Sequence, residues 1–173
     1  MKDRDVHGGL DRLKVLVVDD NQHMRAIVGA ILRSAGVTAI REAGDGSRAL
    51  AILHEFPADV AIVDCQMSPM DGLEFTRRLR DPKTSPRPTL PIVMMTGHAA
   101  KARVLEARAA GVNEFLVKPI TAQGVLDRLI ATTQKPRQPV SAPTYVGPDR
   151  RRISQTNVYV PKRRASDAKT AGA

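Results

Sequence analysis

Short, mostly apolar runs alternate along the chain with stretches in which apolar residues recur every three or four positions. The runs lie at residues 15–18, 38–42, 59–64, 92–95 and 113–117, and the periodic stretches at 21–35, 45–55, 71–80, 100–110 and 122–132. A short apolar run is typical of a strand buried on both faces, and a 3.6-residue period is typical of a helix packed on one face. Five strands alternating with five helices predict an α/β fold, a doubly wound parallel sheet.

Polar residues end or follow four of these runs. Asp19 and Asp20 follow the first run, Asp64 ends the third, and Thr96 and Lys118 follow the fourth and fifth. Because the carboxyl ends of parallel strands meet at one edge of a sheet, we expect these five side chains to converge there. Taken alone, a carboxylate at a strand end more often caps the next turn. Convergence of all five favours a functional site.

The residue types in the expected cluster indicate metal binding and phosphorylation of a carboxylate. Three carboxylates that meet repel each other unless a cation compensates, and an oxygen-only ligand set suits Mg²⁺ better than zinc. With that charge neutralised, Asp64 can act as a nucleophile toward phosphorus and form an aspartyl phosphate. Thr96 would donate a hydrogen bond to a phosphoryl oxygen, and Lys118 would pair with another.

Composition narrows the class of protein. The 173 residues are 42% apolar and include one cysteine, Cys65, but no run of eighteen apolar residues. A disulfide framework within the chain and a membrane-inserted helix are therefore excluded, and we expect a cytoplasmic protein. The net charge is +9, but residues 135–173 hold nine Lys/Arg against two Asp/Glu. The basic character belongs mainly to this C-terminal part.

The chain is expected to divide into four segments: a flexible leader (1–12), the α/β domain (13–133), a proline-rich linker (134–144) and an arginine-rich duplicated tail (145–173). In the tail, a proline, two arginines and an acceptor recur at an offset of thirteen residues, as the pairs Pro148 and Pro161, Arg150 and Arg163, Arg151 and Arg164, and Ser154 and Asp167. A charge run that happens to be basic need not repeat, so the repeat favours a binding function.

Four motifs, VLVVDDN, AIVDCQMSPMDG, PIVMMTGHA and NEFLVKPI, resemble those of the receiver domain of bacterial response regulators over residues 13–133. The resemblance implies a flavodoxin-like (βα)5 fold with strand order 2-1-3-4-5. It also implies that Asp64 is the phosphoacceptor, that Asp19 and Asp20 bind the metal, and that Thr96 and Lys118 are the switch hydroxyl and the phosphate-pairing lysine.

The same resemblance implies finer details around the site. The backbone carbonyl of Gln66 would complete the metal shell, the Lys118–Pro119 bond would be cis, and Phe115 would be a mobile aromatic switch, the alternative being a fixed core residue. One departure is visible: Ser68 stands where the family usually has proline, and the proline is displaced by one position. Since the loop length is kept, we expect the metal site to survive.

Each copy of the tail repeat pairs an arginine with an acceptor three residues later, which resembles the Arg-x-x-Asp arrangement of sites for cyclic di-GMP. An arginine fork can donate to O6 and N7 of guanine, a carboxylate can accept from N1 and N2, and tyrosine or guanidinium planes can stack on the bases. The residues assigned to this ligand are Tyr145, Pro148, Asp149, Arg150, Arg151, Arg152, Ser154, Tyr159, Arg163, Arg164 and Asp167.

A CheY-like receiver followed by such a tail resembles the Cle-type cyclic di-GMP effectors. The resemblance implies a protein that is not an enzyme, whose tail is disordered or ordered by the ligand. It would dock on the flagellar motor switch protein through the face formed by residues 101–110, Phe115 and 122–130. Recruitment to the flagellar base or the cell pole would follow.

Two alternatives remain open. In the first, the chain is an ordinary phosphoacceptor receiver, which takes its phosphoryl group from a sensor histidine kinase or a phosphotransfer protein, and the tail is a disordered solubility element. The tail would otherwise bind nucleic acid or an anionic membrane surface nonspecifically, without membrane insertion; nucleic acid is the disfavoured partner. Because residues 134–173 contain no helix-turn-helix, zinc motif or catalytic output domain, we expect the output to come through surfaces of the receiver or through the tail.

Overall fold

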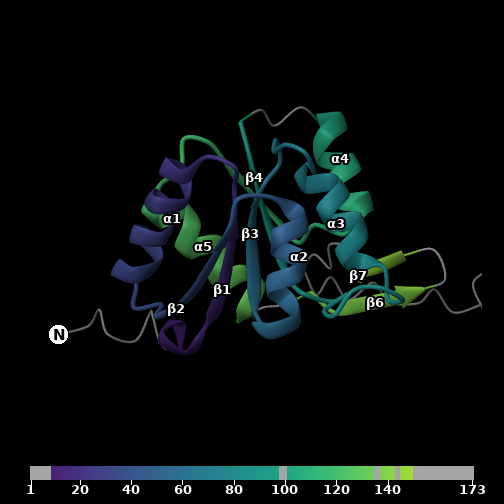
Figure 1. Cartoon of the computed structure of the whole chain (residues 1–173), viewed down its shortest axis with the longest axis horizontal. Coiled ribbons are helices and arrows are strands. Elements are labelled where there is room, and N and C mark those ends of the chain that lie inside the picture. The colour runs from purple at the N-terminus through teal and green to yellow at the C-terminus, as the bar shows by residue number, and fades with distance from the viewer. Residues whose placement is uncertain (1–8, 98–100, 135–136, 143–144, 150–173) are drawn as a thin grey trace, which may run out of the picture.

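Five parallel strands form the central sheet of the computed structural model, which describes residues 9–97, 101–134, 137–142 and 145–149 (Figure 1). In spatial order the strands are β2 (Ala39–Ala43), β1 (Lys14–Val18), β3 (Val60–Asp64), β4 (Ile92–Thr96) and β5 (Glu114–Val117). The prediction of a flavodoxin-like α/β fold with strand order 2-1-3-4-5 is confirmed.

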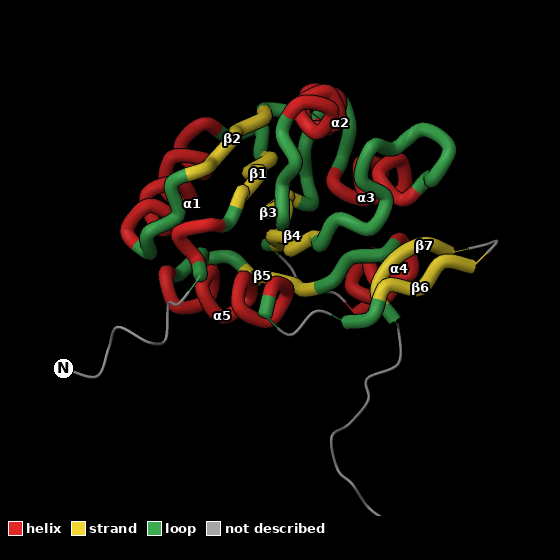
Figure 2. The backbone as a smooth tube through the Cα atoms, turned by 90° about the horizontal axis from the view of Figure 1, so that it is seen from below, coloured by secondary structure: helices red, strands yellow, loops and turns green. Residues whose placement is uncertain are grey.

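Five α-helices cover the two faces of the sheet: α1 (Gln22–Ser34), α2 (Gly46–Glu55), α3 (Gly72–Arg80), α4 (Lys101–Ala110) and α5 (Ala122–Thr133). α1 and α5 pack on one face, and α2, α3 and α4 on the other (Figure 2). Side chains that accept backbone N–H groups begin four of these helices, namely Asn21, Asp45, Asp71 and Thr121. Such caps define where each helix starts.

The apolar runs mark the strands because the central strands are buried on both faces. Alternate residues of β1 contribute to opposite cores, Leu16 and Val18 to the α2–α3–α4 side and Val15 and Val17 to the α1–α5 side. Every residue of β3 and β4 is buried, whereas the edge strands β2 and β5 are only partly so. A strand covered on both faces has no polar alternation in its sequence.

Both ends of the domain differ from the expected segments. Residues 10–12 of the predicted flexible leader form a 3-10 turn, η1 (Leu10–Arg12), and Leu10 is fully buried in the α1–α5 core. The predicted proline-rich linker instead contains a strand, β6 (Pro139–Ala142), which pairs antiparallel with β7 (Tyr145–Pro148). Residues 1–8 and 150–173, which carry the rest of the leader and of the tail, lie outside the described residues.

The β6–β7 hairpin lies beside the C-terminal ends of α3 and α4 (Figures 1 and 2). A side chain at Gly147 would come within 3.0 Å of Gly111 Cα, in the turn between α4 and β5, so only glycine permits this approach. These contacts with the domain, rather than an apolar pattern, order the segment. Among the described residues, no helix combines the length and apolar content needed to cross a membrane.

Candidate phosphoacceptor site

Three carboxylates meet at the C-terminal edge of the sheet. Asp19 and Asp20 follow β1, and Asp64 is the last residue of the neighbouring strand β3. One oxygen from each side chain lies within 4.8 Å of the other two. The convergence expected from the strand ends is therefore present for all three acidic residues.

Lys118 reaches the same point from the edge strand β5. Its Nζ lies 2.8 Å from Asp64 Oδ1 and 3.9 Å from Asp19 Oδ2. The backbone N–H of Lys118 donates to the carbonyl of Thr96 at 2.9 Å, and Thr96 is buried at the end of β4. The Lys118–Pro119 bond is cis, as the resemblance implied. β4 lies between β3 and β5, so Thr96 borders the strand that carries Asp64.

The loop after β3 is tied back onto the cluster by backbone N–H groups. Gln66 N–H donates to Asp64 Oδ2 at 3.2 Å, and Ser68 N–H donates to Asp20 Oδ2 at 3.3 Å. Gly72 closes the loop, its N–H donating to the carbonyl of Cys65 at 3.1 Å. A Cβ at position 72 would overlap the carbonyl oxygen of Asp64, so the loop needs glycine there. The Ser68–Pro69 bond is also cis.

The cluster suits a hard divalent cation. Asp19 is 1% exposed, and its Oδ2 accepts no hydrogen bond. Burial raises the pKa of the Asp19 carboxyl, the neighbouring carboxylates of Asp64 and Asp20 add to the effect, and the Asn21 N–H and Lys118 oppose it. A buried carboxylate oxygen without a donor, next to two further carboxylates, is completed by an oxygen-preferring cation such as Mg²⁺.

Two residues named from the resemblance stay predictions in their finer roles. Gln66 is held beside Asp64 by its N–H group, and its carbonyl remains the predicted fourth ligand. Phe115 is partly buried and packs against the α2–α3–α4 core, which fits both a fixed core residue and a switch.

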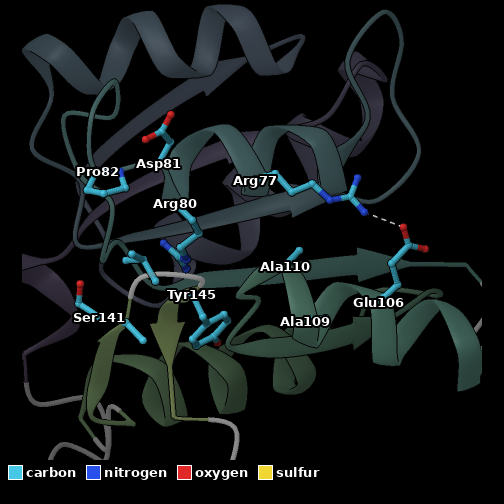
Figure 3. Close-up of a pocket in the computed structure, with 11 residues that line it drawn as sticks. Arg77, Arg80, Asp81, Pro82, Glu106, Ala109, Ala110, Ser141 and Tyr145 are labelled. Carbon is cyan, nitrogen blue, oxygen red and sulfur yellow. Dashed lines mark hydrogen bonds and ion pairs between the residues drawn. The ribbon is translucent and has the colours of Figure 1, made fainter.

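Of the residues assigned to the tail ligand, Tyr145, Pro148 and Asp149 lie on or directly after β7. The others, Arg150, Arg151, Arg152, Ser154, Tyr159, Arg163, Arg164 and Asp167, lie outside the described residues. The hairpin borders a hollow of about 650 Å³ against α3 and α4. Figure 3 shows it between the paired Arg77 and Glu106, 2.7 Å apart, and the hairpin residues Ser141 and Tyr145.

Sequence reasoning missed Arg80, which anchors the hairpin side of the domain. Arg80 is 5% exposed and donates to the carbonyls of Gly111 and Pro88, both at 2.8 Å. Burial lowers the pKa of its guanidinium to about 10, so the group stays charged at neutral pH. Its position was readable: with Gly72, Phe75, Thr76 and Leu79 it completes the helical stripe of buried positions on α3.

Comparison with known proteins shows which family the sequence matches. Residues 15–130 match the family described as the response regulator receiver domain. The chemotaxis protein CheY of Pseudomonas aeruginosa is 38% identical over 117 residues, which cover 68% of this chain and 93% of that protein. The match to the family ends before β6.

Solved structures of receiver proteins have a similar fold. The chemotaxis protein CheY4 of Vibrio cholerae is similar with a TM-score of 0.63 at 34% identity, covering 68% of this chain and 95% of that one. The receiver domain of the histidine kinase CKI1 from Arabidopsis thaliana, complexed with Mg²⁺ and BeF3⁻, has a TM-score of 0.62 at 31% identity, covering 71% and 92%.

Proposed function

The chain belongs to the response regulator receiver domain family, of the two-component and chemotaxis type, and from that premise we propose that it accepts a phosphoryl group on Asp64. The donor is a sensor histidine kinase or a phosphotransfer protein. The observation that carries the proposal is the Asp64 carboxylate, held 2.8 Å from Lys118 Nζ within a cluster of three carboxylates. The protein is thus a signalling protein rather than an enzyme with a small-molecule substrate.

Each side chain of the site has a different role in the phosphoryl transfer. Asp19, Asp20, Asp64 and the carbonyl of Gln66 would hold Mg²⁺, and the bound ion would neutralise charge around the phosphoryl group. An Asp64 oxygen attacks phosphorus, the P–N bond to the donor histidine breaks, and the bonding electrons leave with the imidazole. Lys118 and the Thr96 hydroxyl then donate to phosphoryl oxygens.

The test is phosphorylation by acetyl phosphate in the presence of Mg²⁺, followed by intact-protein mass spectrometry. Asp64→Asn should lose the added mass of one phosphoryl group because the amide is not a nucleophile toward phosphorus. Asp59→Asn is the matched control. Asp59 directly precedes the N-terminal end of β3, and its carboxylate accepts a hydrogen bond from the Lys14 N–H. Undiminished labelling of Asp64→Asn would contradict the assignment of the nucleophile.

We also propose that the arginine-rich tail binds cyclic di-GMP and that the liganded protein docks on the flagellar motor switch protein. The repeated Arg-x-x-acceptor motif supports the ligand. Two exposed large apolar side chains support the docking face, Leu105 on α4 at 54% and Val117 at the end of β5 at 50%. A cytoplasmic protein recruited to the flagellar base in this way would couple the second messenger to motility.

Calorimetric titration of cyclic di-GMP into the full chain tests the ligand. Binding should weaken strongly in the double variant Arg151→Ala, Arg164→Ala, and cyclic di-AMP should not compete, because adenine lacks the O6 acceptor. Nonspecific nucleic-acid binding would instead collapse with rising salt and ignore Asp167→Asn. Saturable binding that is indifferent to the arginines would reject this assignment of the tail.

Docking is tested by binding of the liganded full chain to purified motor switch protein. Val117→Asp should weaken the complex because it places a charge on the apolar face. Ile27→Asp, on α1 and similarly exposed at 49%, is the matched control. Equal loss in both variants, or loss in neither, would speak against this face.

A further inference from the structure

A smaller hollow, of about 250 Å³, lies between the C-terminal half of α4 and the β6–β7 hairpin. Its wall is partly apolar and partly charged. The apolar part consists of Leu105, Ala109, Val112 and Pro148, and the remainder of Arg108, Arg137, Tyr145 and Asp149. Pockets that hold small ligands combine an apolar lining with a few converging polar groups in this way.

The aromatic wall of the hollow is held in one orientation. Tyr145 Oη donates to the carbonyl of Pro148 at 2.7 Å, so the ring folds back along its own strand. Gly147 makes room for it, since a Cβ there would lie 2.7 Å from Tyr145 Oη. The hairpin is closed by the Asp149 N–H, which donates to the carbonyl of Gln138 at 2.9 Å. Tyr145 and Asp149 are therefore presented by a closed two-stranded element.

The guanidinium groups of Arg137 and Arg108 differ in the interactions that they form within the protein. Arg137 forms an ion pair with Glu114 at 3.0 Å. Arg108, by contrast, makes no side-chain hydrogen bond or ion pair with any other residue in the described ranges. In the larger hollow, Arg77 is paired with Glu106 and Arg80 with backbone carbonyls. The smaller hollow thus has an arginine available for a ligand beside a carboxylate and an aromatic ring.

We propose that this hollow is a subsite for one guanine base of cyclic di-GMP, so that the receiver body contributes Arg108 of α4 to the ligand site. The inference rests on the proposed ligand of the tail. Arg108 donates to O6 and N7 of the base, Asp149 accepts from N1 and N2, and the Tyr145 ring packs against the base plane.

The position of the hollow connects the ligand to the rest of the protein. Arg150, Arg151 and Arg152, which belong to the proposed tail motif, directly follow Asp149 in the sequence. On the other side, Arg108 shares α4 with Leu105, so the ligand bridges the tail and the proposed docking helix.

The experiment uses the full chain and two readouts. Calorimetry measures the Kd of cyclic di-GMP for the wild type, for Arg108→Ala and for Arg33→Ala. Arg33 is an exposed arginine on α1 and gives a control of equal charge. Two-dimensional NMR of the wild type then records which backbone amides shift on saturation with cyclic di-GMP.

We expect Arg108→Ala to raise Kd about tenfold or more, the loss of one bidentate base contact, and Arg33→Ala to change it little. Amides of residues 105–112 and 145–149 should shift. Wild-type binding with an unchanged Kd in Arg108→Ala, or with no shift in α4, would overturn the subsite while leaving the tail ligand in place. An absence of wild-type binding would overturn both the subsite and the proposed ligand.

Discussion

Replacing Asp19 by asparagine should stabilise the metal-free protein while removing its response to Mg²⁺. Asp19 is almost fully buried, its Oδ2 has no hydrogen-bond donor, and two further carboxylates lie within 4.8 Å. The amide keeps the size of the side chain and an oxygen that can accept from the Asn21 N–H, which is 2.8 Å from Asp19 Oδ1. It removes the buried charge and puts an NH₂ group in the place of Oδ2, the oxygen that accepts no hydrogen bond.

Coulomb's law indicates the size of the effect. At an effective dielectric constant near 20, two like charges no more than 4.8 Å apart repel by at least about 3.5 kcal/mol, and the attraction of Lys118 Nζ at 3.9 Å is about 4 kcal/mol. The Asp64 repulsion and the Lys118 attraction therefore nearly cancel. Burial and the charge of Asp20 remain, and both disfavour the ionised Asp19. We expect a net gain on the order of 1 kcal/mol, a rise in Tm of roughly 2–4 °C.

The gain should depend on pH. Because burial raises the pKa of Asp19 above its ordinary 3.8, the folded protein binds more protons than the unfolded chain at pH values between the two pKa values. The stability of the wild type therefore falls as pH rises through that window. The advantage of Asp19→Asn should be full near neutral pH and shrink as the pH falls toward 3.8.

Thermal unfolding followed by circular dichroism, in EDTA and in millimolar Mg²⁺, measures both effects. The wild type should gain stability with Mg²⁺ because only the folded state binds it, and Asp19→Asn should gain much less. Asp11→Asn removes an exposed carboxylate in η1 and serves as the control. A variant less stable than the wild type in EDTA would refute the repulsion and burial argument. An undiminished Mg²⁺ response would refute Asp19 as a ligand.

Two further substitutions, measured by urea unfolding, test the packing around the phosphoacceptor site and around the buried Arg80. Gly72→Ala should cost about 1–3 kcal/mol, because its methyl group meets a β3 carbonyl; Gly97→Ala, which has open space around its Cβ, is the control, and equal losses would dismiss the steric reason. Arg80→Leu should cost about 3 kcal/mol, because buried acceptors such as the Gly111 carbonyl lose their donors. Arg78→Leu, an exposed position on the same helix, should cost far less; a similar cost would show that the buried contacts add little.

The position of the candidate site could be predicted from local sequence because its side chains lie at the ends of strands. Asp64 and Thr96 end fully buried strands, whose continuous apolar runs are visible without a structure. The parallel topology then brings such ends together whatever their separation in sequence. The distance of 2.8 Å between Lys118 and Asp64, and the missing donor at Asp19 Oδ2, could not be predicted. Both depend on side-chain packing around the loop that Gly72 closes.

The sequence by itself determined the order of strands and helices along the chain and the edge at which the acidic residues meet. Burial leaves apolar runs and periodic patterns in the sequence, so these features are readable residue by residue. Only the tertiary structure decided the β6–β7 hairpin, the carbonyl groups to which Arg80 donates and the hollow beside Arg108. The hairpin strands have little apolar signal, and their order comes from contacts such as Gly147 against Gly111, between residues distant in sequence. Contacts of that kind exist only once the chain has folded.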